Sequence, residues 1–117
     1  GKPVVVAQCH CRNCQRQSGS AFSVNLMVKA DGVTTQGALT TYEDRDTHSG
    51  NSVHRRFCGT CGSPIFSELA DDNGMVIVKA GTLDEPGAFV PSVSVWTSTK
   101  WPWVELPQGQ HSFPQNP

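Results

Sequence analysis

The chain of 117 residues lacks a long hydrophobic run, an excess of charge of either sign and any extended helical periodicity. Its longest apolar stretches, such as residues 75–78, are the size of a strand, whereas a helix that crosses a bilayer needs roughly 20 residues. Nine Lys and Arg balance ten Asp and Glu, so no basic field would attract nucleic acid or an anionic membrane. We therefore expect a soluble protein that binds neither.

Recognisable signals for export or for several common enzyme classes are also missing. The first residues, GKPVVVAQC, do not combine a charged start, a long apolar region and a small-residue cleavage site, so the cytoplasm is the expected compartment. There is no Gly-rich phosphate loop and no serine nucleophile motif. In a reducing compartment, the five cysteines are expected to be metal ligands or catalytic thiols, and their odd number disfavours a closed set of disulfides.

What the sequence does contain is a series of short runs of β-branched and aromatic residues, separated by turn-forming residues. This pattern predicts a mainly β fold with at most short helical turns. Residues 12–18 have too little apolar content for more than one helical turn, which Gly19 would end. Strands are expected at residues 4–11, 21–29, 33–35, 39–42, 52–57, 64–69, 75–80 and 92–97, with a hairpin turn at residues 71–74.

Three cysteines lie within six residues, in the order Cys9-x-Cys11-x-x-Cys14. Residues i and i+2 of a strand project to the same face, so Cys9 and Cys11 can face one ion, and Cys14 can return to it through the next turn. Three protein ligands with an open fourth position are typical of a catalytic zinc site. His10 would point away from Cys9 and Cys11 on a regular strand, so a surface or packing role is expected for it.

A second cysteine pair, Cys58 and Cys61, lies in the motif CGTCG, which has zinc-knuckle spacing. Its two glycines allow the backbone to turn tightly and to aim N–H groups at the sulfurs. An alternative arrangement joins Cys11, Cys14, Cys58 and Cys61 in one site and leaves Cys9 out, and the residues alone leave both arrangements open. A redox C-x-x-C is a third interpretation, but the βαβ context of such motifs is missing.

The segments CHCRNCQRQSGSAF, CGTCGSPIF, AGTLDEP and KWPWVEL, in this order and spacing, resemble the glutathione-dependent formaldehyde-activating enzyme family. The resemblance implies a small, mostly antiparallel zinc-binding β fold, called a β-tent, with two metal sites. It implies that Cys9, Cys11 and Cys14 bind the catalytic zinc. Cys58 and Cys61 would be half of a structural four-cysteine zinc site, whose other half is a C-x-C near the family's N-terminus.

No cysteine precedes Cys9, which is a departure from the family pattern. The expectation is a single domain over residues 1–117 without the family's N-terminal cysteine-containing hairpin, either as a fragment or as a natural short form. The Cys58 and Cys61 site would then be empty, be completed by another chain, as in a homo-oligomer, or recruit a residue such as His54.

The resemblance implies a carbon–sulfur lyase similar to S-(hydroxymethyl)glutathione synthase. A zinc-bound glutathione, or a similar thiol, would lose its proton and add to formaldehyde or another small aldehyde. Arg12 and Arg16 are candidates to pair with carboxylates of the thiol ligand, and Ser18 and Gly19 are candidates to donate hydrogen bonds to it. The alternative is a non-catalytic zinc-binding β domain for a protein or small-ligand partner.

Overall fold

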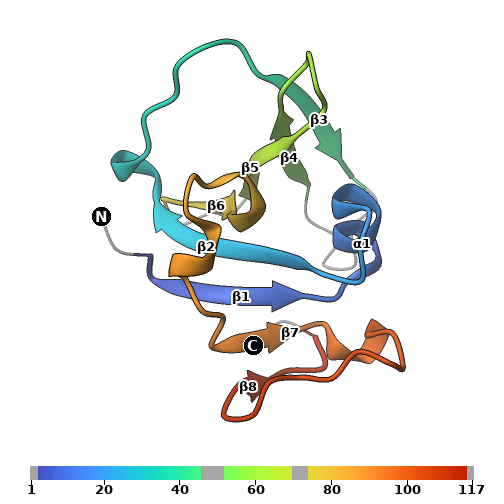
Figure 1. Ribbon diagram of the computed structural model, residues 1–117. Helices are drawn as coiled ribbons and strands as arrows, with labels where there is room; N and C mark the ends of the chain where they lie inside the picture. The colour runs from blue at the N-terminus through green and yellow to red at the C-terminus, as the bar shows by residue number, and fades with distance from the viewer. Residues whose placement is uncertain (1–2, 46–51, 70–73, 116–117) are drawn as a thin grey trace.

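A computed structural model describes residues 3–45, 52–69 and 74–115. These residues form one eight-stranded sheet with the strand order β3-β4-β5-β6-β2-β1-β7-β8, which confirms the predicted mainly β class (Figure 1). The strands are β1 (Val5–Cys9), β2 (Ser23–Lys29), β3 (Thr40–Asp44), β4 (Val53–Phe57), β5 (Pro64–Leu69), β6 (Met75–Lys79), β7 (Val93–Val95) and β8 (His111–Ser112). The helical elements are α1 (Arg12–Ser18) and the 3-10 turns η1 (Ala30–Gly32), η2 (Ala80–Thr82), η3 (Pro86–Ala88) and η4 (Thr97–Thr99).

The strand pairing is antiparallel except at one edge of the sheet. There, β7 pairs in parallel with both β1 and β8, so the N-terminal and C-terminal parts of the chain lie side by side (Figure 1). The strand expected at residues 33–35 is not formed, because this segment follows η1 as irregular chain with mostly exposed residues. The predicted turn at residues 71–74 lies outside the described residues except for Gly74.

The helix α1 is longer than the single turn that we predicted. It has seven residues, or about two turns at 3.6 residues per turn. The prediction failed because α1 is held by buried Cys14 and Gln15 rather than by an apolar stripe. Gly19 ends the helix as expected, with a left-handed φ of 65° and with its backbone N–H donating to the Gln15 carbonyl.

The sheet has one apolar and one polar face, and both are covered. The apolar face carries the core of Val6, Leu26 and Ala80, against which Val24, Val28, Val78, Leu83 and Phe89 pack. This arrangement confirms the expected alternation of β2. The segment after β6, which supplies Leu83 and Phe89, closes this face.

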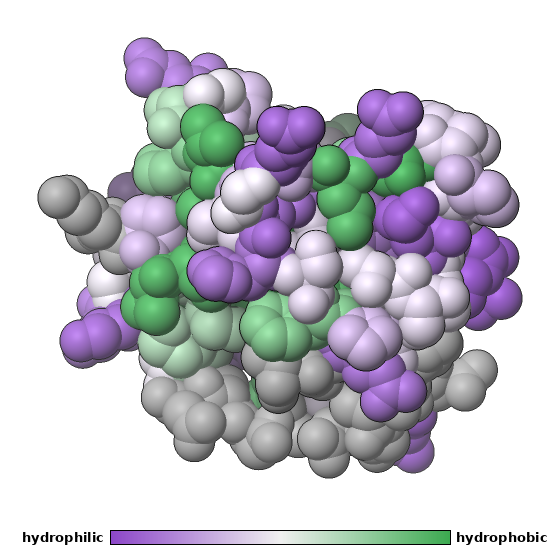
Figure 2. All heavy atoms as spheres, turned by 90° about the horizontal axis from the view of Figure 1, so that it is seen from below, coloured by the Kyte–Doolittle hydropathy of each residue, from purple (hydrophilic) through white to green (hydrophobic). Residues whose placement is uncertain are grey.

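Helix α1 packs on the opposite, polar face. Cross-strand pairs place buried Cys9, Ser23, Lys79, Ser67 and Arg55 on this face. The face seen in Figure 2 is mixed, with small separate patches of hydrophobic side chains among hydrophilic ones. Within the described ranges, no helix has the length and apolar character needed to span a membrane.

Candidate metal centre

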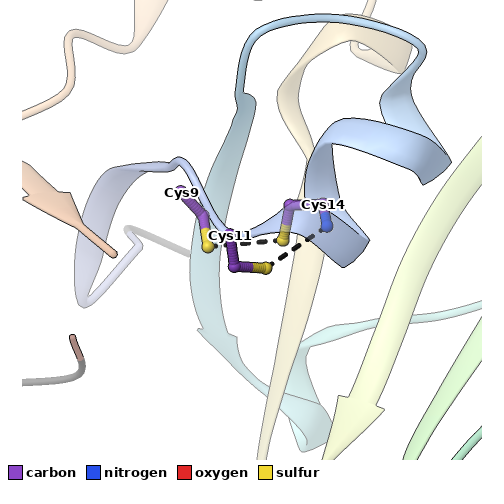
Figure 3. A group of neighbouring side chains, drawn as sticks. All are labelled: Cys9, Cys11 and Cys14. Carbon is purple, nitrogen blue, oxygen red and sulfur yellow. Dashed lines mark hydrogen bonds between the residues drawn. The ribbon is translucent and has the colours of Figure 1, made fainter. Parts of the chain in front are cut away.

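Three cysteine side chains converge where β1 leads into α1. The Sγ atoms of Cys9, Cys11 and Cys14 all lie within 4.8 Å of one another, and those of Cys9 and Cys14 are 3.3 Å apart. Figure 3 shows the three side chains pointing toward one another. Cys9 and Cys14 are buried, whereas Cys11 is partly exposed. This cluster can hold a metal ion with three sulfur ligands, and solvent reaches it on the Cys11 side.

The cysteines converge for a different reason from the one predicted. Strand β1 ends at Cys9, so Cys9 and Cys11 do not share a strand face. Cys11 is instead the N-cap of α1, with extended backbone angles, and its Sγ accepts a 3.2 Å hydrogen bond from the backbone N–H of Cys14. The cap and the first turn of the helix therefore set the positions of the last two sulfurs.

The closely spaced thiols of the cluster differ in their pKa values. Hydrogen bonds from Cys11 and Cys9 hold the pKa of Cys14 far below that of an ordinary thiol, and the nearby Lys79 ammonium contributes in the same direction. Hydrogen bonds with Cys11 and Cys14, together with burial, raise the pKa of Cys9. A cluster that already favours one thiolate is suited to a soft divalent ion such as zinc, which binds cysteine as thiolate.

His10 lies between the first two cysteines in sequence but has a packing role, as expected. Its ring is fully buried and its centroid lies 5.1 Å from that of Phe22. Burial lowers the pKa of His10, which favours the neutral ring. The backbone at His10 is also held in place by a hydrogen bond, in which the His10 N–H donates to the Val95 carbonyl at 3.1 Å.

The Cys58 and Cys61 pair forms a tight knuckle away from the three-cysteine cluster. The Gly62 N–H donates to the Cys58 carbonyl at 2.8 Å, and Gly62 has the expected positive φ, at 81°. Gly59, the other glycine of the motif, does not have a positive φ. Backbone N–H groups of Cys61 and Thr60 lower the pKa of Cys58. The knuckle thus aims N–H groups at a sulfur, which suits a thiolate ligand.

The structure does not bring Cys58 and Cys61 into one site with Cys11 and Cys14. Among the described residues, the only cluster of three or more donors is that of Cys9, Cys11 and Cys14, so the alternative four-cysteine arrangement is not present. His54 does not complete the knuckle either, because it is exposed and its Nε2 lies 3.1 Å from Glu43 Oε2.

A pocket of about 520 Å³ lies beside α1. Its lining comes from α1, from β3, β4 and β5, and from the cysteine knuckle, and consists of Asn13, Arg16, Gln17, Tyr42, Asp44, Arg55, Phe57, Gly62 and Pro64. Of the four residues predicted to contact a thiol ligand, only Arg16 is in this lining. Arg12 hydrogen-bonds Gln15, the Ser18 hydroxyl donates to the Gln15 carbonyl at 3.4 Å, and Gly19 caps the helix.

One wall of the pocket is a buried ion pair that the sequence analysis missed. Arg55 Nε donates to Asp44 Oδ2 at 2.9 Å, and a second guanidinium nitrogen of Arg55 donates to Gln17 Oε1 at 2.8 Å. Both charged side chains are less than a tenth exposed. The pair joins β3 and β4 to α1. Arg55 comes two residues after buried Val53 in β4 and so falls on the same face of that strand, and this position was the available signal.

Lys79 was also missed, although it ends the apolar run MVIVK. It is buried on the cysteine side of the sheet, and its Nζ donates to Asn25 Oδ1 at 3.1 Å. A lysine at the end of a strand is normally expected to reach solvent, so its sequence position gave little reason to place it at the site.

The fold and the cluster define a small, mainly β protein with a three-cysteine candidate metal centre. Residues 1–99 match the family model described as glutathione-dependent formaldehyde-activating enzyme. The chain therefore belongs to this family, and the resemblance seen in the sequence is confirmed. No curated protein sequence matches the chain.

Proposed function

We propose that the chain is a zinc-dependent carbon–sulfur lyase similar to S-(hydroxymethyl)glutathione synthase. The observation that carries the proposal is the convergence of Cys9, Cys11 and Cys14, together with membership of the family. Three cysteines can hold one zinc ion and leave a fourth position for a ligand. The five cysteines are free thiols, which is compatible with the reducing cytoplasm that we propose as the compartment.

The bound zinc would supply one chemical effect, the stabilisation of the substrate thiol as its thiolate. The reaction joins the thiol sulfur of glutathione, or of a similar thiol, to the carbonyl carbon of formaldehyde or another small aldehyde. The carbonyl π electrons move to oxygen, which takes up the proton given up by the thiol. The product is a hemithioacetal, which carries an S-hydroxymethyl group when the aldehyde is formaldehyde, and no oxidant or reductant is needed.

The chain's own residues would orient the rest of the thiol ligand. The same helix that supplies Cys14 presents Arg16 to the adjoining pocket, whose volume lies within the usual range for small-molecule sites. We assign Arg16 to a carboxylate of a glutathione-like ligand, because a guanidinium can bind a carboxylate through two parallel hydrogen bonds. Arg12, Ser18 and Gly19 remain proposed contacts for parts of the ligand that extend beyond this pocket.

Exchange NMR on a mixture of glutathione, formaldehyde and their adduct tests the proposal. Zinc-loaded protein is expected to accelerate the interconversion, and Cys11→Ser to lose most of this effect. Cys61→Ser is the matched control, because Cys61 lies outside the cluster and is exposed. An unchanged exchange rate with zinc-loaded, folded protein would contradict the enzymatic proposal. If that protein still bound glutathione, the alternative of a non-catalytic zinc-binding domain would be favoured.

A further inference from the structure

Lys79 lies on the same face of the sheet as the cysteine cluster. In the antiparallel pairing of β1 with β2, Cys9 is opposite Ser23, and in the pairing of β2 with β6, Asn25 is opposite Lys79. Ser23 and Asn25 are two residues apart on β2, so all four side chains project to one side. Lys79 and Cys9 therefore lie on the same face of the sheet, in strands separated by β2.

The Lys79 ammonium is buried without a carboxylate to balance it. Only 7% of the residue is exposed, and the acceptor at its Nζ is the neutral Asn25 amide. In the described part of the chain, no Asp or Glu forms an ion pair with it. A buried ammonium without an opposite charge is strongly disfavoured, so Lys79 keeps its charge at this location only beside a negative partner.

Among the described residues, the negative charges that act on Lys79 are the thiolates of the cluster. Burial and the Arg55 guanidinium lower the pKa of Lys79, whereas Cys14, Cys9 and Cys11 raise it. Arg55, which faces the same side of the sheet, is already paired with Asp44 and so does not serve as a second counter-ion for the sulfurs. Lys79 is thus the buried cation that faces the sulfurs without a carboxylate partner of its own.

We propose that Lys79 is the counter-ion of the three-cysteine centre and enables it to accept an anionic fourth ligand, a thiolate. The inference rests on the proposed function. A divalent ion with three thiolates carries one net negative charge, and a fourth thiolate would bring the charge to minus two. The Lys79 ammonium reduces that charge and so favours a thiolate over a neutral ligand at the open position. Lys79 is a positioning residue, because its effect acts through the charge of the centre.

Cobalt-substituted protein provides the test, since the visible absorption of Co²⁺ reports a change in its ligands. Wild type, Lys79→Met and Lys79→Gln are titrated separately with glutathione and with imidazole, a neutral ligand. Both variants are expected to bind glutathione about tenfold more weakly or worse, because a nearby buried charge has been removed. Imidazole affinity is expected to change little. Lys29→Met is the control, because Lys29 lies in β2 but is exposed at the strand's far end.

The glutathione and imidazole affinities of the variants decide whether Lys79 is a counter-ion. Equal glutathione affinity in wild type and the Lys79 variants would overturn the counter-ion role. An equal loss of affinity for glutathione and imidazole would make Lys79 a purely structural residue and would also overturn the counter-ion role. Variants that circular dichroism shows to be unfolded would lead to the same conclusion. If wild-type cobalt protein did not bind glutathione, the proposed function itself would fail, and that result is distinct because it needs no Lys79 variant.

Discussion

The side chain of Gln15 donates a 2.8 Å hydrogen bond to the backbone carbonyl of His10 and so ties α1 to the segment between the first two cysteines. The same amide nitrogen donates to the Thr99 carbonyl at 3.0 Å, and Gln15 Oε1 accepts from Trp101 Nε1 at 3.0 Å. Gln15 is only 3% exposed. It therefore fixes the cysteine-bearing helix to both β1 and the C-terminal segment.

Replacement of Gln15 by Leu is expected to lower the free energy of unfolding by about 2–4 kcal/mol. The substitution leaves the part-buried Thr99 carbonyl and Trp101 indole N–H without this partner, at about 1–3 kcal/mol for each group that stays unsatisfied. The His10 carbonyl loses one of its two donors and keeps the Thr99 hydroxyl. Urea denaturation followed by circular dichroism measures the loss. Gln36→Leu is the control, because Gln36 is exposed. A loss no larger than in the control would contradict the anchoring role of Gln15.

Gly19→Ala is expected to destabilise the protein by about 1 kcal/mol, because a side chain is disfavoured at a φ of 65°. The cost is conformational, since a Cβ at this position would meet no atom within 4 Å. Gly32→Ala is the matched control, with equally open space but no positive φ. Thermal unfolding of the two variants gives the comparison. Equal changes in both would show that the left-handed cap does not matter.

Removal of the buried Arg55 guanidinium is expected to cost about 3–5 kcal/mol in Arg55→Met, because Asp44 would lose its buried counter-ion. In the double variant Arg55→Met with Asp44→Leu, part of the loss is expected to return, since the buried carboxylate is removed together with its guanidinium partner. Chemical denaturation of wild type and the three variants completes a double-mutant cycle. If the double variant were less stable than Arg55→Met, the explanation by an unpaired charge would be wrong.

Metal removal is expected to lower the unfolding temperature of the protein and to act through the three-cysteine cluster. A ligand present at about a thousand times its dissociation constant stabilises the native state by about 4 kcal/mol. A chelator should therefore lower the melting temperature of wild type, and Cys14→Ser should show little further response. Cys61→Ser is expected to keep the response, because Cys61 is outside the cluster. The metal content of the same samples is measured as well. Loss of the metal in Cys61→Ser but not in Cys14→Ser would contradict the assignment to the three-cysteine cluster.

Arg16→Gln is expected to raise the KM for glutathione about tenfold and to leave kcat nearly unchanged. A charge-assisted hydrogen bond contributes about 1.5–3 kcal/mol, and here it would bind the ligand equally before and during the reaction. Arg45→Gln is the control, since Arg45 is largely exposed, pairs with Glu43 and does not line the pocket. A fall in kcat without a change in KM would argue against the assignment of Arg16 to ligand binding.

The apolar part of the fold could be predicted from the sequence because it follows a simple alternation. Val24, Leu26 and Val28 recur every second residue, and they face the core as expected. Helix α1 was predicted too short, because the interactions that hold it come from Gln15 and from residues far along the chain, such as Thr99. Residue patterns record local periodicity, and they do not record such distant contacts.

The candidate site was predictable in its ligands but not in its surroundings. The spacing of Cys9, Cys11 and Cys14 was sufficient to predict a cluster, although the strand argument for it was wrong. Lys79 and Arg55 were missed because charged residues are normally exposed, and their burial depends on partners supplied by other strands and by α1. The spacing alone also could not decide which cysteines share a site.

The three sulfurs of the cluster come from six consecutive residues, whereas Lys79 reaches them only after β2 has paired with β6. Closing so short a loop carries a small entropic cost compared with pairing strands that are about 50 residues apart in the chain. The segment with the three cysteines can therefore bring its sulfurs together before β2 and β6 have paired. The candidate metal ligands thus depend on local chain geometry, whereas the place of Lys79 beside them depends on long-range strand pairing.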